Sequence, residues 1–119
     1  MEKLVRIDFD NIGDKIDFFL YEDNFYEAQE ISNSIKKSIN EAIDLIYKIF
    51  KNTKILLIGA DDLLFSCHEL KKEQLEVLMQ FFFVSTNLTV SIGVGKDIKE
   101  AMLNLKIAKV SGKNIIKGI

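Results

Sequence analysis

Proline is absent from this sequence of 119 residues, and cysteine and histidine occur once each, as Cys67 and His68. A single cysteine excludes a disulfide framework, and one cysteine with one histidine excludes a zinc site built from such residues. A reducing, cytoplasmic environment suits the chain. Because linkers, internal repeats and low-complexity segments are also lacking, residues 1–119 are expected to form a single domain with its own core.

Charge of one sign and long apolar runs are missing too. The chain has 16 Lys and Arg against 18 Asp and Glu, a net charge of -2, so no broad basic face for a long nucleic acid is expected. The longest apolar run, Val77 to Val84, is interrupted by Gln80 and is shorter than the ~20 residues that span a bilayer. The N-terminus has no signal-peptide core. Direct membrane insertion is therefore not expected.

Strand and helix patterns alternate along the chain. Apolar residues recur at helical spacing after an Asn24 cap, and residues 88–94 alternate as in a strand with one polar face. Asp97 and Gly112 are placed to begin and end a last helix. The expected strands are 4–9, 54–58, 63–67, 88–94 and 114–116, and the expected helices are 15–20, 24–50, 69–84 and the segment between Asp97 and Gly112.

The order of these elements predicts an α+β fold. Strand, helix, hairpin, helix, strand, helix and strand fit a ferredoxin-like polymerase palm, a mainly antiparallel sheet with helices packed against it. In that arrangement the first strand lies beside the hairpin. Asp8, at the end of the first strand, is then expected near Asp61 and Asp62 at the hairpin tip.

Asp61 and Asp62 stand out because they interrupt the apolar stretch KILLIGADDLLFSC, residues 54–67. Two adjacent carboxylates there need a cation or full exposure at a turn. Gly59 and Ala60 allow a tight turn and leave room above it. With Asp8, they offer three oxygen ligands without sulfur or imidazole, a set that suits Mg²⁺ or Mn²⁺. A two-metal site of this kind acts on phosphates, so a nucleoside triphosphate is the expected substrate.

Phosphates need donors as well as metal. The turn after the first strand, at the mouth of a helix, can offer backbone N–H groups, and two lysines near Gly112 can offer positive charge. Simpler interpretations stay open, since Asp10 and Asp14 also suit a turn or cap, and the lysines suit a helix end. The candidate nucleotide-binding residues are Phe9, Asp10, Asn11, Ile12, Gly13, Gly59, Ala60, Lys109 and Lys113.

Four segments taken together resemble a known family. They are IDFDNIGDKI, IGADDLLF, TVSIGVG and EAMLNLKIAKVSGKN, and they cover nearly the whole chain. In this order they are similar to GGDEF-like palm domains. The first segment is more like the palm of the large polymerase-like subunit of type III CRISPR systems. The set as a whole resembles the minimal CRISPR polymerase family, mCpol, which consists of free-standing palm domains of about this length.

This resemblance implies that the chain makes a cyclic oligonucleotide, a cyclic dinucleotide with ATP as the favoured substrate, as a messenger in antiviral defence of the Panoptes type. It also implies a separate membrane effector that senses the nucleotide. By position, Asp8 and Asp62 match metal ligands, and Asp61 matches a further ligand or an aid in activating the attacking hydroxyl. Joining two nucleotides needs an acceptor presented opposite the donor, so a homo-oligomer with facing sites is expected.

Two residues depart from the family pattern, and three other functions remain to be weighed. Ala60 stands where the second of two paired glycines is usual, and Phe9 where glycine is common between the first two aspartates. A phosphoacceptor receiver domain is disfavoured because residues 54–67 leave no room for a helix between strands. A palm-like module that binds nucleotide without catalysis, and a diguanylate-cyclase-like enzyme that uses GTP, remain as alternatives.

Overall fold

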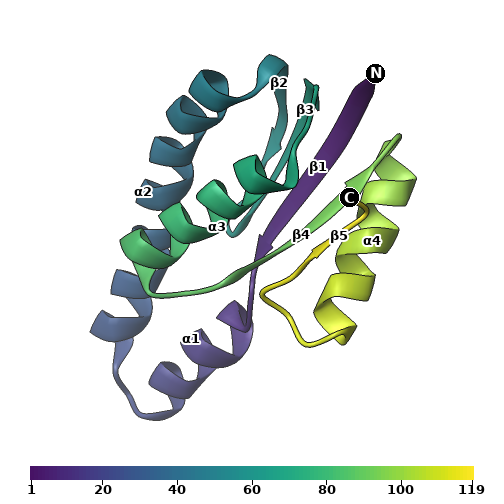
Figure 1. The fold of residues 1–119 in the computed structure, drawn as a ribbon. Coiled ribbons are helices and arrows are strands. Elements are labelled where there is room, and N and C mark those ends of the chain that lie inside the picture. The colour runs from purple at the N-terminus through teal and green to yellow at the C-terminus, as the bar shows by residue number, and fades with distance from the viewer.

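The computed structural model describes all residues from 1 to 119 and contains five strands and four helices (Figure 1). None of the helices combines the length and the apolarity that crossing a bilayer requires. The elements, in chain order, are β1 (Glu2–Phe9), α1 (Ile12–Tyr21), α2 (Phe25–Ile49), β2 (Lys51–Ile58), β3 (Asp62–His68), α3 (Lys72–Thr86), β4 (Val90–Gly95), α4 (Ile98–Val110) and β5 (Ile116–Lys117).

The five strands form one sheet in the order β2-β3-β1-β4-β5. The central strand β1 runs antiparallel to both of its neighbours, and only β5 pairs in parallel, with β4. This confirms the expected α+β, palm-like fold with a mainly antiparallel sheet. β5 begins at Ile116 rather than at residue 114, because Lys113 and Asn114 have left-handed backbone φ of 64° and 52° and form a turn.

The two faces of the sheet carry different helices. Figure 1 shows α2 and α3 on one side and α4 on the other. Every second residue of β1 and β4 belongs to the main core beneath α2 and α3, including Val5, Ile7, Ile92 and Val94. The alternate face of β4, which includes Ser91, was expected to be polar, and polar faces are often exposed to solvent. This face is buried instead, because α4 lies directly on it.

Element boundaries differ from those expected where the backbone turns through left-handed conformations, which asparagine tolerates better than most residues. α1 begins at Ile12, not at residue 15, because Asn11 has φ of 60° and turns the chain at once from β1 into the helix. β2 begins at Lys51, not at residue 54, and its register with β3 shifts around Asn52, where φ is 49°. Glu69, with φ of 54°, delays α3 until Lys72.

The single cysteine is part of the core. Cys67 is fully buried in β3, and burial raises the pKa of its thiol to about 11. A thiol with so high a pKa is protonated at neutral pH and is a poor nucleophile. The role of Cys67 is therefore structural, as part of the core.

The contact of α4 with β4 predicts a sharp difference between two glycines. A Cβ on Gly93 would lie 2.2 Å from both the Ala101 carbonyl oxygen and the Leu105 backbone nitrogen, whereas a Cβ on Gly13 would meet nothing within 4 Å. We expect Gly93→Ala to lower the free energy of unfolding by about 1–3 kcal/mol, because the helix must move off the sheet. Gly13→Ala should be neutral or slightly stabilising. Urea denaturation of both variants measures this, and equal stability of the two would contradict the close packing of α4.

Candidate active site

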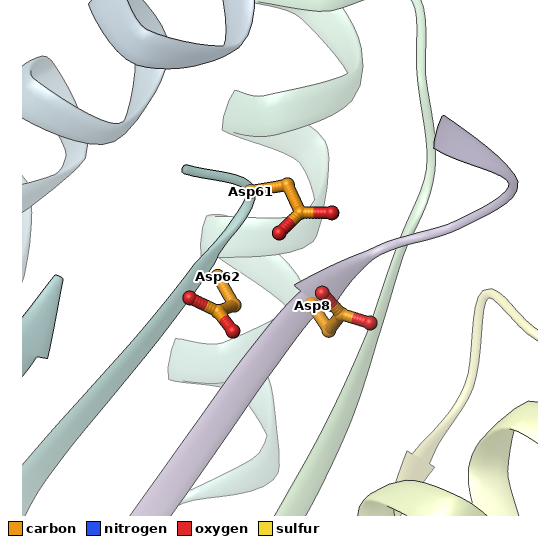
Figure 2. A group of neighbouring side chains, drawn as sticks. All are labelled: Asp8, Asp61 and Asp62. Atoms are coloured by element: carbon orange, nitrogen blue, oxygen red, sulfur yellow. The ribbon is translucent and has the colours of Figure 1, made fainter. Parts of the chain in front are cut away.

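Three aspartates meet where the ends of β1 and β3 lie side by side. Asp8 is directly opposite Asp62 in the antiparallel register, and Asp61 precedes Asp62 at the tip of the β2–β3 hairpin. One carboxylate oxygen from each residue lies within 4.8 Å of the other two. Figure 2 shows Asp8 on β1, Asp62 on the adjoining position of β3, and Asp61 on the loop above them. The structure therefore brings together the three acids that the sequence singled out.

The β1–β3 register also determines the face of the sheet on which the acids lie. Ile7 and Leu63 point into the main core beneath α2 and α3, so Asp8 and Asp62, their neighbours in the chain, point to the opposite face. This is the face that α4 covers in part. The Phe9 N–H donates to the Asp61 carbonyl at 3.1 Å and ties the hairpin tip to the end of β1.

The absence of a side chain at Gly59 leaves the space that the Asp62 carboxylate occupies. A Cβ built on Gly59 would lie only 1.7 Å from Asp62 Oδ1. The backbone φ of Gly59 is not in the left-handed region, so space rather than conformation requires glycine here. The Gly59 N–H donates to the Asp62 carbonyl at 3.0 Å and closes the hairpin loop. Ala60, the next residue, is exposed.

Two cations neutralise the two strand acids. Lys109 Nζ lies 3.1 Å from Asp8 Oδ2, and Arg6 Nη2 donates to Asp62 Oδ2 at 2.5 Å. Burial raises the pKa of the Asp8 carboxyl, Lys109 partly offsets this by a hydrogen bond and its charge, and the charges of Asp61 and Asp62 raise it further. Asp61 has no ion pair and accepts no side-chain hydrogen bond. The site is thus an anionic cluster held by cations on two of its three members.

Asp10 has a different environment from the other acids. It is buried, with 3% of its surface exposed, and its carboxylate accepts four hydrogen bonds. The donors are the hydroxyls of Thr89 at 2.6 Å and Ser91 at 2.7 Å, Lys109 Nζ at 2.8 Å and the Asn114 N–H at 3.0 Å. Burial alone would raise the pKa of Asp10, but the bonds from Lys109, Ser91 and Thr89 outweigh it and lower the pKa. Asp10 joins elements of the fold and presents no carboxylate to a ligand.

The turn from Phe9 to Gly13 offers fewer free donors than the sequence suggested. The N–H groups of Phe9 and Asp10 already donate to carbonyls of neighbouring segments. Those of Asn11, Ile12 and Gly13, at the start of α1, donate to no other group of the protein. This part of the turn is the only stretch of it with N–H groups open to an anion.

The two candidate lysines both reach this turn. Lys109 Nζ donates to the Phe9 carbonyl at 2.9 Å in addition to its contacts with Asp8 and Asp10, so its three donors are engaged. Lys113 Nζ donates to the side-chain oxygen of Asn11, at the surface. Of the two, Lys113 is the one whose ammonium group is placed to meet a ligand at the start of α1.

Sequence reasoning missed the polar residues that support the acids: Arg6, Thr89, Ser91 and Asn114. Their signal was weak, because each is ordinary by itself and becomes informative only through strand register. Arg6 could have been noticed as a charged residue two positions before Asp8, on the same face of a strand that is otherwise apolar.

A hollow of about 400 Å³ lies on the other side of the hairpin tip, between α2 and the loop. Volumes of this order are typical of small-molecule pockets, which combine apolar walls with a few polar groups. Two of the residues expected to contact nucleotide, Gly59 and Ala60, line it. The remaining lining residues are Ser32, Lys36, Ile39, Asn40 and Ile58.

The donor set fits a hard divalent ion. Asp8, Asp61 and Asp62 supply carboxylate oxygens only, and Mg²⁺ and Mn²⁺ prefer such oxygens to nitrogen or sulfur. The 4.8 Å limit on the separation of the ligand atoms leaves room for ions between them. These three residues are the ones in this structure that could hold a metal.

Solved structures with the same fold include nucleotide cyclase domains. The chain is 14% identical to the GGDEF domain of DgcB from Caulobacter crescentus in complex with c-di-GMP, with a TM-score of 0.63 over 98% of this chain and 76% of that one. It is 15% identical to a chain of the Csm1–Csm4 cassette in complex with cA4, with a TM-score of 0.69 over 98% of this chain and 21% of that one.

The same cassette in complex with one ATP gives 16% identity and a TM-score of 0.69, over 97% of this chain and 20% of the other. The chain thus spans about a fifth of the length of that larger protein. Identities this low show a common palm-type fold. No curated protein sequence matches the chain. The family model of the minimal CRISPR polymerase domain does match it, over residues 4–119, and the chain therefore belongs to the mCpol family.

Proposed function

We propose that this protein is a metal-dependent nucleotidyltransferase that joins ATP into a cyclic dinucleotide, which acts as a messenger in antiphage defence. The observation that carries the proposal is the convergence of Asp8, Asp61 and Asp62 within 4.8 Å at the end of the central strands of a palm fold. Membership of the mCpol family supports polymerase-like or cyclase-like chemistry.

The three aspartates have the role of metal ligands in this proposal. Mg²⁺ or Mn²⁺ in a two-metal site supplies charge for in-line displacement at the α-phosphorus, with pyrophosphate as the leaving group. Asp8 and Asp62 hold ligand oxygens on the α4 face of the sheet, and Asp61 extends the set from the hairpin tip. Asp61, which is free of ion pairs, is also available to accept the proton of the attacking hydroxyl.

The remaining nucleotide-binding candidates are assigned by their surroundings. In this proposal the N–H groups of Asn11, Ile12 and Gly13, which donate to no other group of the protein, bind the triphosphate together with Lys113. Phe9 contributes to this turn through its backbone, and Asp10 and Lys109 support it from beneath. The hollow beside Gly59 and Ala60 has a suitable volume for the sugar and base.

ATP is the proposed substrate because a chain of the Csm1–Csm4 cassette, which is similar in fold, is seen in complex with ATP. GTP is the second candidate, favoured by the GGDEF domain whose structure contains c-di-GMP. Incubation with each nucleoside triphosphate and Mg²⁺ or Mn²⁺, followed by mass spectrometry and nuclease digestion of the products, tests both. A product made from GTP alone would contradict the choice of ATP.

The proposal includes partners beyond the substrate. The enzyme works in the cytoplasm as a homo-oligomer whose sites face each other. One small palm holds one activated triphosphate, so the nucleotide that carries the acceptor hydroxyl must be held by a second protomer. A separate membrane effector senses the product. Neither a long nucleic acid nor insertion of this chain into a membrane has a part in the reaction.

The site assignment predicts the effect of removing two charges. Asp61→Asn with Asp62→Asn should lower product formation at least ~10²-fold, because metal-bound charge contributes several kcal/mol to the transition state. Circular dichroism should show an unchanged fold. The matched control is Asp17→Asn with Asp44→Asn, two exposed acids on α1 and α2. Product from the first double variant at the control's rate would show that the site lies elsewhere.

The contact between Gly59 and Asp62 generates a second prediction. In Gly59→Ala the added methyl would displace the Asp62 carboxylate, so Mn²⁺ affinity should fall about 10-fold or more, as when support for a ligand is lost. Ala60→Gly, the adjacent control, removes an exposed methyl and should leave the affinity unchanged. Isothermal titration with Mn²⁺ compares the two variants, and equal affinities would contradict a ligand role for Asp62.

The facing-site arrangement predicts that activity depends on protein concentration. Specific activity should fall on dilution as the oligomer dissociates, and the midpoint should match the dissociation seen by analytical ultracentrifugation. A protein that sediments as a monomer at all concentrations while keeping full specific activity would overturn this part of the proposal and leave the metal site untouched.

A further inference from the structure

Arg6 lies in the centre of the sheet, in an environment unusual for a charged residue. It is the β1 residue opposite Leu64 of β3 and Gly93 of β4, and its side chain is 18% exposed. Nη2 donates to Asp62 Oδ2 at 2.5 Å, and this is the only hydrogen bond that the guanidinium makes. Its Nε is buried and has no acceptor. Arg6 thus makes its hydrogen bond to Asp62 through Nη2 while its buried Nε has no hydrogen-bond partner.

The unpaired Nε argues against a purely stabilising role. A buried donor without an acceptor is unfavourable, and a partly buried ion pair gains little once desolvation is counted. An apolar side chain of similar length would pack between Leu64 and Gly93 without that loss. What the arginine adds at this place is a fixed contact to one oxygen of Asp62.

Asp62 needs such a contact because its neighbours repel it. Three carboxylates with ligand atoms within 4.8 Å of one another favour rotation of a side chain out of the cluster. Lys109 opposes this at Asp8, where it bonds Oδ2 at 3.1 Å. Arg6 opposes it at Asp62 in the same manner, through Oδ2. Each cation takes one oxygen of its aspartate and leaves the other without a hydrogen bond.

A cation beside a metal site also has an opposing effect, since it repels an incoming ion. Arg6 and Lys109 offset two of the three negative charges of the cluster, so the cluster keeps a net negative charge that attracts a divalent ion. The acids are already within ligand distance while both cations are in contact with them. The two cations are therefore compatible with the close approach of the three carboxylates.

We propose that Arg6 is a positioning residue that holds Asp62 in the metal-binding arrangement of the site. It acts through Asp62 and contacts neither metal nor nucleotide. The inference rests on the proposed metal-dependent function, and it adds a residue that sets the affinity of the site for the ion.

The test is isothermal titration of the full-length protein with Mn²⁺ alone, without nucleotide. Arg6→Met, an unbranched side chain with no donors, should weaken Mn²⁺ binding about 10–100-fold, the usual effect of removing a group that orients a metal ligand. Arg6→Lys, which keeps the charge and loses the planar fork, should give an intermediate affinity. Thermal unfolding of Arg6→Met without metal should occur at or above the temperature of the parent protein.

The matched control is Lys51→Met. Lys51 also pairs with a carboxylate, Glu69, at 3.0 Å, but both side chains are largely exposed and lie at the far end of the β2–β3 pair. This variant removes the same unit of charge and should leave Mn²⁺ affinity unchanged. A loss equal to that of Arg6→Met would show that the effect does not depend on the contact with Asp62, and it would overturn the proposal.

A double-mutant comparison separates positioning from general structure. In an Asp62→Asn background, Arg6→Met should cause no further loss of Mn²⁺ affinity, because the residue through which Arg6 acts has already been changed. A further loss of the full size would overturn the proposal. If the parent protein binds Mn²⁺ and Arg6→Met binds it with equal or higher affinity, the proposal is also overturned. Absence of Mn²⁺ binding by the parent would instead overturn the proposed function itself, and this inference with it.

Discussion

The buried carboxylate of Asp10 is the interaction on which the shape of the site depends. It directly follows the central strand and accepts bonds from β4 and the residue before it, from α4 and from the loop before β5. Breaking a buried pair of this kind by removing one partner typically costs about 3–5 kcal/mol. Because Lys109 is shared between Asp10 and Asp8, the same interaction also fixes the charge next to the candidate metal ligands. Fold and site are joined through one ammonium group.

The two faces of the sheet differ in composition and role. The face beneath α2 and α3 holds most of the apolar core, and its residues come from every second position of the central strands. The other face combines the acids with the cations that support them, and glycines at 93 and 95 let α4 approach the backbone closely there. A strand buried on both faces leaves few positions for charge, so the acids of the site stand at the strand ends and Arg6 is the charged residue in the interior of β1.

The fold and the acids could be predicted from the sequence because they follow from local patterns. The order of the strand and helix patterns predicted a palm arrangement in which β1 lies beside the hairpin. The position of Asp8 at the end of that strand then placed it near Asp61 and Asp62. Element boundaries were less accurate where asparagine adopts a left-handed backbone, as at Asn11 and Asn52, since either a turn or a continued element suits that residue.

The supporting residues could not be predicted in the same way. Whether Asp10 is exposed in a turn or buried depends on which β4 side chains lie beside it, and that follows from the register between distant strands. Arg6 became meaningful only when Asp62 was found within its reach. These contacts join residues 56 and more positions apart, and no local pattern encodes them.

The close contact between Gly59 and Asp62 has a consequence for how the chain can vary. An aspartate at 62 in this rotamer and any side chain at 59 exclude each other, because both would occupy the same volume. Substitutions at the two positions are therefore coupled: a larger residue at 59 becomes tolerable only after 62 has been shortened or turned away. Among variants selected for stability alone, the pair can drift together. Among variants selected for metal binding, neither residue 59 nor residue 62 can be substituted first without loss of the site, so glycine at 59 and aspartate at 62 are both retained.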